Sequence, residues 1–140
     1  MNIVVHGGEQ ERSLQLSNNE YFDLSELKAM TQSSISQLEL VVLGSCYSGA
    51  YSDNFVETFL NKGVEVAIGF VGDVEQTVML YWMDAFHYYI ANGNNVETAI
   101  NQANSDLIYK YSNTIYESVI SGITSGMNYS RSDLSFVPIS

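Results

Sequence analysis

Three short apolar runs constrain the fold of this chain more than any other feature. They are rich in Val, Ile and Leu, barely alternate with polar residues, and cover Asn2–Val5, Leu38–Leu43 and Val64–Phe70. Strands that are covered on both faces have this pattern, whereas half-exposed strands alternate. A fourth run, Leu134–Val137, precedes Pro138, whose missing N–H suits the end of a strand. The sequence therefore predicts a mainly parallel sheet with helices on both faces.

Helical spacing of apolar residues fills the intervals between these runs. The first helix is expected to begin at Asp23, where Glu26 completes a capping box, and to extend to about Ile35. Gly63 and Gly93 are natural stops for two later helices. These further helices are expected at about Asp53–Lys62, at Val74–Ala91 with Asp73 as N-cap, and from Asn95 to about Ile120.

Two remaining segments fit neither a buried strand nor a helix. Residues Glu9–Phe22 have the pattern of a small hairpin with a polar turn, and Ser121–Asp133 is Gly/Ser-rich, which is typical of a loop. We find no internal repeat and no linker, so residues 1–140 are expected to form one domain. Strands that alternate with helices indicate an α/β architecture with right-handed crossovers.

The composition indicates a folded core, and the net charge disfavours some classes of binding partner. Hydrophobic residues make up 46% of the chain and charged residues 15%, and the formal net charge is −11. Such a surface repels nucleic acid and anionic lipid, because there is no basic patch to neutralise phosphates. The same negative charge would attract basic peptides. Alternatively, the charge provides only solubility.

Cysteine usage and the apolar pattern point to a reducing compartment. Cys46 is the only cysteine, so no disulfide can form within the chain. Neither a signal peptide nor an apolar run long enough to cross a bilayer is visible, and a cytoplasmic location is expected. The spacing of His, Cys, Asp and Glu matches no metal site, and the Gly-containing segments lack the pattern of a phosphate loop. We therefore expect no metal and no cofactor.

Two motifs follow neighbouring strands at the point where each strand ends. The first is "IVVHGG", which places His6 and Gly7 after the first run, and the second is "VVLGSCYSG", which places Cys46 after the second run. In open parallel sheets, the active crevice lies at the carboxyl ends of the strands. His6 and Cys46 are therefore expected at the same edge of the sheet, although 40 positions separate them in the sequence.

Cysteine-based nucleophilic catalysis requires this combination of residues. The thiolate is the nucleophile, and a nearby imidazole can deprotonate the thiol and then protonate a leaving amine. Backbone N–H groups best stabilise the oxyanion that develops, and the amides of Gly7 and Cys46 are the candidate donors. Gly44 and Gly49 would let the chain turn sharply around the thiol.

The order of these motifs resembles that of the caspase-like cysteine peptidases of clan CD, and within them the bacterial CHAT-type domains. The resemblance rests on an apolar strand, His6-Gly7, an interval of about forty residues, and a second apolar strand leading to "GSCYSG". It implies a caspase-like three-layer sandwich and hydrolysis of peptide bonds by a Cys–His dyad without metal or cofactor. It further implies His6 as general acid and base, Cys46 as nucleophile and Gly7 as an oxyanion donor.

A third segment, "GFVGDVEQ" at residues 69–76, is similar to the "G-x-L-W-D-V" segment of separase-type members. The resemblance places Asp73 on the aspartate that binds a basic P1 side chain, so we expect Arg or Lys at P1. Many relatives of this specificity carry an acid two residues before the cysteine, where this chain has Gly44, and Gly72 replaces the tryptophan. The preference would then depend on Asp73 alone. Asp73 could also be an ordinary N-cap without a functional role.

Caspase-like domains begin with two strands that precede the histidine strand, whereas here the histidine strand comes first and His6 is the sixth residue. We interpret the chain as the C-terminal part of a larger domain, as one partnered by an upstream chain, or as a reduced fold. A first strand without its neighbour exposes a sheet edge, which favours pairing with a second copy, so a homodimer is also considered.

Three alternatives to the peptidase remain open from the sequence. Cys46 could be a small buried hydrophobic residue, which is the usual role of a lone cysteine. The chain could be a catalytically inactive caspase-like module used for binding or assembly. It could also be a flavodoxin-like regulatory domain with no chemistry at the cysteine. The other histidine, His87, lies among aromatic residues in a predicted helix and is interpreted as structural.

Overall fold

The computed structural model describes the chain except for residues 1, 4–5, 8–12, 18–19, 51–53, 131–133, 136 and 139–140. The chain divides into two compact units. The first unit contains Met1–Asp73 and Met127–Ser132, and the second contains Val74–Gly126 and Asp133–Ser140. All of the candidate site residues lie in the first unit.

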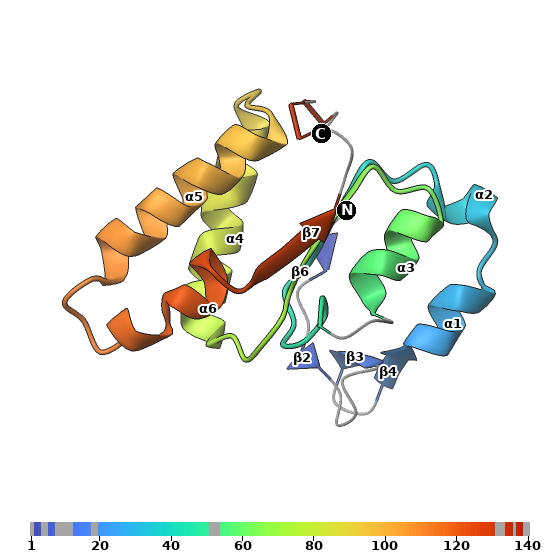
Figure 1. Cartoon of the computed structure of the whole chain (residues 1–140), viewed down its shortest axis with the longest axis horizontal. Coiled ribbons are helices and arrows are strands. Elements are labelled where there is room, and N and C mark those ends of the chain that lie inside the picture. The colour runs from blue at the N-terminus through green and yellow to red at the C-terminus, as the bar shows by residue number, and fades with distance from the viewer. Residues whose placement is uncertain are drawn as a thin grey trace. The chain divides into compact units, whose positions relative to one another are not determined.

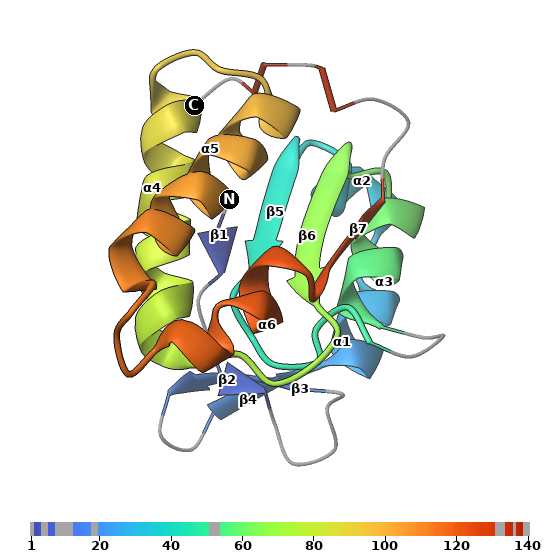
Figure 2. The same ribbon diagram turned by 60° about the vertical axis from the view of Figure 1, so that its left-hand side comes forward.

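The main sheet of the first unit has the strand order β1-β5-β6-β7; Figure 1 labels β6 and β7, and Figure 2 labels all four strands. The strands β1, β5 and β6 are parallel, whereas β7 runs antiparallel to β6. Every residue of β5 and β6 is buried, as their uninterrupted apolar sequences predict. The predicted α/β class with a mainly parallel sheet is thus confirmed. The four strands are β1 (Asn2–Ile3), β5 (Leu40–Leu43), β6 (Val66–Phe70) and β7 (Met127–Ser130).

The prediction of a strand at Leu134–Val137 is wrong, because the fourth strand of the sheet is β7, inside the segment expected to be a loop. The described residues of the Leu134–Val137 run belong to no strand. The carbonyl of Leu134 instead accepts the N–H of Glu97 at 3.1 Å, and the Leu134 side chain is buried. This run therefore provides a hydrogen-bond acceptor for an N–H group in the first turn of a helix, and it does not pair as a strand.

A second, antiparallel sheet contains the predicted hairpin and one strand that the sequence did not reveal. The hairpin strands β3 (Ser13–Ser17) and β4 (Glu20–Asp23) pair as expected. The third strand, β2 (His6–Gly7), pairs with β3, so that His6 lies opposite Gln15 and Gly7 opposite Leu14. The described part of the first predicted strand is β1, and the candidate histidine belongs to a separate strand.

Three helices follow in the first unit, each with an identifiable start. At the first, the N–H of Asp23 donates to the Glu26 carboxylate at 3.1 Å, which confirms the predicted capping box. The predicted helix is interrupted at Met30 and Thr31, so it forms two short helices. Asn54 caps the third helix, because its side chain accepts the N–H of Glu57 at 2.9 Å. The helices are α1 (Leu24–Ala29), α2 (Gln32–Ile35) and α3 (Phe55–Asn61).

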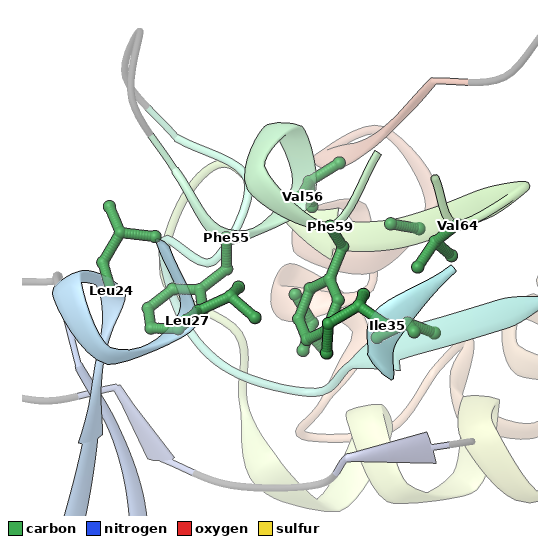
Figure 3. Packing of buried hydrophobic residues seen from close by; sticks show 10 residues of the cluster. Leu24, Leu27, Ile35, Phe55, Val56, Phe59 and Val64 are labelled. Atoms are coloured by element: carbon green, nitrogen blue, oxygen red, sulfur yellow. The ribbon is translucent and has the colours of Figure 1, made fainter. Parts of the chain in front are cut away.

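An apolar cluster joins α1, α2 and α3 to the strands β5 and β6 (Figure 3). Complete burial of a Val, Leu, Ile or Phe side chain contributes about 1.5–3 kcal/mol to the free energy of folding. Because β5 and α3 are both anchored in this cluster, the segment between them has fixed ends. The buried residues of the cluster are Leu24, Leu27, Ile35, Val41, Leu43, Phe55, Val56, Phe59, Val64 and Ala67.

The second unit is helical: α4 (Gln76–Ala91), α5 (Val96–Tyr111), the 3-10 helix η1 (Glu117–Val119) and α6 (Ser121–Thr124). The indole N–H of Trp82 donates to Asn104 at 2.8 Å, which joins α4 to α5. The predicted helix from Asn95 to Ile120 ends at Tyr111, and Asn113 has a positive φ of 64°. No helix in the described part of the chain is long and apolar enough to cross a membrane.

The aromatic residues of α4 form part of the core of this unit. Trp82 and Phe86 are fully buried, with their rings stacked at a centroid distance of 5.0 Å. The half-buried His87 makes an edge contact with Phe86. Burial lowers the pKa of His87 from its ordinary value, although the nearby Asp84 opposes this effect. A largely neutral histidine in this position fits the structural role that the sequence suggested.

Candidate active site

The two candidate catalytic residues follow neighbouring strands that run in the same direction. Strand β1 pairs in parallel with β5, so that Ile3 lies opposite Leu43. His6 comes three residues after Ile3, and Cys46 comes three residues after Leu43. In Figure 2 the arrowheads of β1, β5 and β6 all point to the end of the first unit where β2, β3 and β4 lie. The strands that precede His6 and Cys46 thus end at the same end of the main sheet, where His6 itself belongs to β2 of the second sheet.

Cys46 is the second residue of a tight turn directly after β5. The N–H of Ser48 donates to the carbonyl of Ser45 at 3.3 Å, which closes a β-turn over residues 45–48. Tyr47, the third residue of this turn, has a φ of 61°, which is the signature of a type II turn. The thiol is half-buried in this position rather than enclosed in the core. The turn thus displays Cys46 at its tip.

After this turn the chain doubles back along the end of β6. The N–H of Tyr47 donates to the carbonyl of Gly72 at 3.1 Å, and the N–H of Gly49 donates to that of Phe70 at 2.9 Å. These alternating bonds run in the antiparallel sense, although β5 itself is parallel to β6. We call residues 44–50 the Cys46 loop. Its position depends on bonds to β6 and to the segment that follows it.

Ser48 is a further residue on which the Cys46 loop depends, and the sequence analysis gave it no role. Its side chain is 2% exposed, and its hydroxyl lies 3.1 Å from the carbonyl of Leu43 and 2.9 Å from that of Ser45. The same hydroxyl accepts the N–H of Phe70 at 3.1 Å. No signal in the sequence indicated this role, because only the structure shows that the hydroxyl is buried and therefore requires hydrogen-bond partners.

Replacing Ser48 with alanine is expected to lower the free energy of unfolding by about 1–3 kcal/mol, because the buried N–H of Phe70 would lose its acceptor. Denaturant unfolding monitored by circular dichroism measures this change. The same substitution at Ser33, which is exposed in α2, is the matched control and should change stability by less than about 0.5 kcal/mol. Equal effects of the two substitutions would contradict the role of Ser48.

The candidate substrate-binding residue Asp73 is exposed and follows the segment that holds the Cys46 loop. Its neighbour Gly72 accepts the hydrogen bond from Tyr47, which is the residue after Cys46. The alternative interpretation of Asp73 as the cap of α4 is wrong, because the Glu75 carboxylate accepts the N–H of Val78 at 3.0 Å and α4 begins at Gln76. Capping of α4 therefore does not account for the aspartate at position 73.

Two glycines complete the set of candidate residues. Gly44 is buried directly after β5, and Gly7 lies in the backbone of β2. Within the described residues, no group of three or more His, Cys, Asp or Glu side chains gathers as a set of metal ligands. The arrangement thus presents a half-buried thiol on a turn that follows β5, while His6 belongs to β2 of the second sheet.

Comparison with protein families matches residues 3–121 of the chain to the CHAT domain. The match covers most of the 140 residues and contains every candidate site residue: His6, Gly7, Gly44, Cys46 and Asp73. No curated protein matches the chain.

Proposed function

The chain belongs to the CHAT domain family, whose members have the caspase-like fold of clan CD, and from this premise we propose that it is a cysteine endopeptidase. Cys46 is the nucleophile and His6 the general acid and base. The observation that supports this proposal is the parallel pairing of β1 with β5, because the chain leaves both strands at the same end of the sheet, three residues before His6 and three residues before Cys46. The half-buried position of Cys46 on a tight turn supports it, because a nucleophile must be accessible to substrate.

In the proposed reaction, His6 takes the thiol proton and the sulfur of Cys46 attacks the carbonyl carbon of the scissile bond. The backbone N–H groups of Gly7 and Cys46 donate hydrogen bonds to the oxyanion of the tetrahedral intermediate. His6 then protonates the leaving amine, and a thioester between substrate and Cys46 remains. Water, deprotonated by His6, attacks this thioester, and the carboxylic acid product leaves as the thiol is restored.

The same proposal includes a preference for Arg or Lys at P1, with Asp73 as the group that binds the cation. Asp73 is exposed, and the Tyr47–Gly72 hydrogen bond links its segment to the residue that follows Cys46. Gly44 provides no second acid, so the recognition depends on Asp73. The net charge of −11 supports a basic substrate through long-range attraction.

Replacing Asp73 with asparagine is expected to lower kcat/KM for substrates with Arg or Lys at P1 by about 10- to 100-fold, as the loss of a charge-assisted hydrogen bond implies. Hydrolysis of fluorogenic peptides that differ only at P1 measures the effect. The control is Glu65→Gln, which removes the same charge from an exposed residue just before β6. Equal cleavage after Arg, Asp and Leu by the unmodified chain would remove Asp73 from the proposal.

A further inference from the structure

Three residues of α4 lie on one face of this helix. Tyr81, Asp84 and Tyr88 are three and four positions apart, a spacing that places side chains next to one another along a helix. Asp84 is exposed, Tyr88 is 63% exposed, and Tyr81 is half-buried. The buried residues of α4 lie on the opposite side of the helix. An acidic side chain is therefore flanked by two tyrosines on the face of α4 that does not contribute to the core.

Contacts within the second unit hold the rings of both tyrosines. The Tyr81 ring meets that of Tyr111 in α5 edge to face, at a centroid distance of 5.5 Å. The Tyr88 ring lies at 83° to that of Tyr89, with the centroids 5.2 Å apart, and the Tyr89 hydroxyl donates to Asp106 at 2.6 Å. Rings that are ordered before a partner arrives lose less conformational entropy on binding, which favours association.

Apolar side chains extend this surface onto α5 and the segment that follows it. Ile108 precedes Tyr111 by three positions, so both lie on one face of α5, and Ile108 is 46% exposed. The Tyr116 ring packs against that of Tyr111 with the centroids 5.4 Å apart, and the neighbouring Ile115 is 88% exposed. Exposed apolar residues grouped with tyrosines are typical of surfaces that bind another protein. We call this set the tyrosine surface: Tyr81, Asp84, Tyr88, Ile108, Tyr111, Ile115 and Tyr116.

The charge of the second unit indicates which partner suits this surface. Residues 74–126 contain five acidic side chains against one lysine and no arginine. A second copy of the chain carries the same formal net charge of −11 and would be repelled. A guanidinium group can stack on a tyrosine ring while its N–H groups donate to a carboxylate. Asp84, with Tyr81 and Tyr88 on either side, provides both of these partners on one helix face.

We propose that the tyrosine surface binds an arginine-containing segment of a partner protein, in which an apolar residue lies beside the arginine. The guanidinium group pairs with Asp84 and stacks on Tyr88, and the apolar residue packs against Ile108. This interaction requires neither Cys46 nor Asp73, so it is independent of the proposed peptidase activity.

The test measures binding of a short fluorescein-labelled peptide of alternating Arg and Leu by fluorescence anisotropy. The chain carries Cys46→Ala and Asp73→Asn, so that the candidate active site neither cleaves the probe nor binds its arginine through Asp73. Adding Asp84→Asn or Tyr88→Leu is expected to raise the Kd at least about fivefold, because each removes one partner of the guanidinium group. Tyr88→Phe keeps the ring and should keep the Kd within about twofold.

Two matched controls remove the same groups from other surfaces. Glu65→Gln removes one negative charge from an exposed residue of the first unit. Tyr109→Leu removes a tyrosine of α5 that is 90% exposed but lies two positions from Tyr111, on a different face of the helix. Both should leave the Kd within about twofold, and thermal melts of all variants should show that each one is folded.

The same peptide with lysine in place of arginine is expected to bind at least about threefold more weakly, because an ammonium group offers no planar fork. Equal affinities for the two peptides would overturn the inference, since net charge alone would then attract the probe. A Kd above about 1 mM would also overturn it, as would a Kd that Asp84→Asn and Tyr88→Leu leave unchanged. Dimerisation in sedimentation experiments that Tyr88→Leu abolishes would identify a second copy as the occupant, and would equally overturn it.

Discussion

Replacing Cys46 with alanine is expected to abolish peptide hydrolysis, with a loss of at least about 10⁴-fold in kcat. The reason is that no other cysteine in the chain could form the thioester. Because Cys46 is half-buried at the tip of a turn, alanine should leave the fold intact, and the thermal unfolding midpoint should change little. Initial rates with a fluorogenic peptide and a thermal melt measure both quantities on the same preparation.

The two histidines provide an internal comparison for this prediction. His6→Ala is expected to lower kcat by about 10²- to 10⁴-fold, which is the usual contribution of general acid–base catalysis. His87→Gln, a change in the half-buried histidine of α4, is the control and should leave kcat unchanged. Hydrolysis that survives in Cys46→Ala, or an equal loss with both histidine variants, would contradict the assignment of the dyad.

The second large effect is expected from Gly69→Ala in β6. A Cβ at this position would lie 2.6 Å from Val56 Cγ2, 2.7 Å from Ser48 Oγ and 3.1 Å from the amide nitrogen of Gly49. These contacts are too short, so Ser48 and the Cys46 loop must move. Overpacking of this kind costs about 1–3 kcal/mol in the free energy of unfolding. The activity should fall further than the loss of stability explains, because the displaced loop carries the proposed nucleophile.

The matched control for Gly69→Ala is Gly72→Ala. The chemical change is the same and the two positions are three residues apart, but the added methyl group at Gly72 would meet no described atom within 4 Å. Its free energy of unfolding should stay within about 0.5 kcal/mol of the unmodified chain. Denaturant unfolding of the two variants measures the difference. Equal stabilities would mean that the close packing of Gly69 against the Cys46 loop has no energetic role.

The parts of the fold that the sequence predicted are those in which local pattern and tertiary burial agree. Uninterrupted apolar runs predicted β5 and β6, which are buried on both faces. The capping pattern at Asp23 and the stop at Gly63 act within a few residues, and both are present as predicted. Gly63 has a φ of 100°, a conformation that glycine adopts without strain.

The elements that the sequence did not reveal depend on partners that are distant in the chain. The strand β7 has no strong strand pattern, and it forms because Met127 and Tyr129 pair with Phe70 and Ile68 at the edge of the sheet. The Leu134–Val137 run is more apolar, yet its Leu134 carbonyl binds the first turn of α5 instead. In neither segment does the local sequence specify which distant backbone groups the segment will bind.

For the candidate site, topology was predictable and detailed geometry was not. The parallel pairing of β1 with β5, the strands that precede His6 and Cys46, followed from the apolar pattern of the two runs. The course of the Cys46 loop involves hydrogen bonds from the N–H groups of Tyr47 and Gly49 to the carbonyls of Gly72 and Phe70. The hydroxyl of Ser48 also accepts the N–H of Phe70. A pattern in one sequence contains no information about which distant carbonyl a loop amide will bind.

The most direct test of the central claim is the rate at which iodoacetamide alkylates Cys46, followed by intact mass. The chain has one cysteine, so a single adduct reports on this thiol alone. If His6 activates Cys46, the folded chain should react near neutral pH at least about tenfold faster than the same chain unfolded in urea, and His6→Ala should remove this advantage while His87→Gln retains it. Equal rates for the folded chain and for His6→Ala would contradict the dyad, and an unreactive Cys46 would favour an inactive module used for binding or assembly.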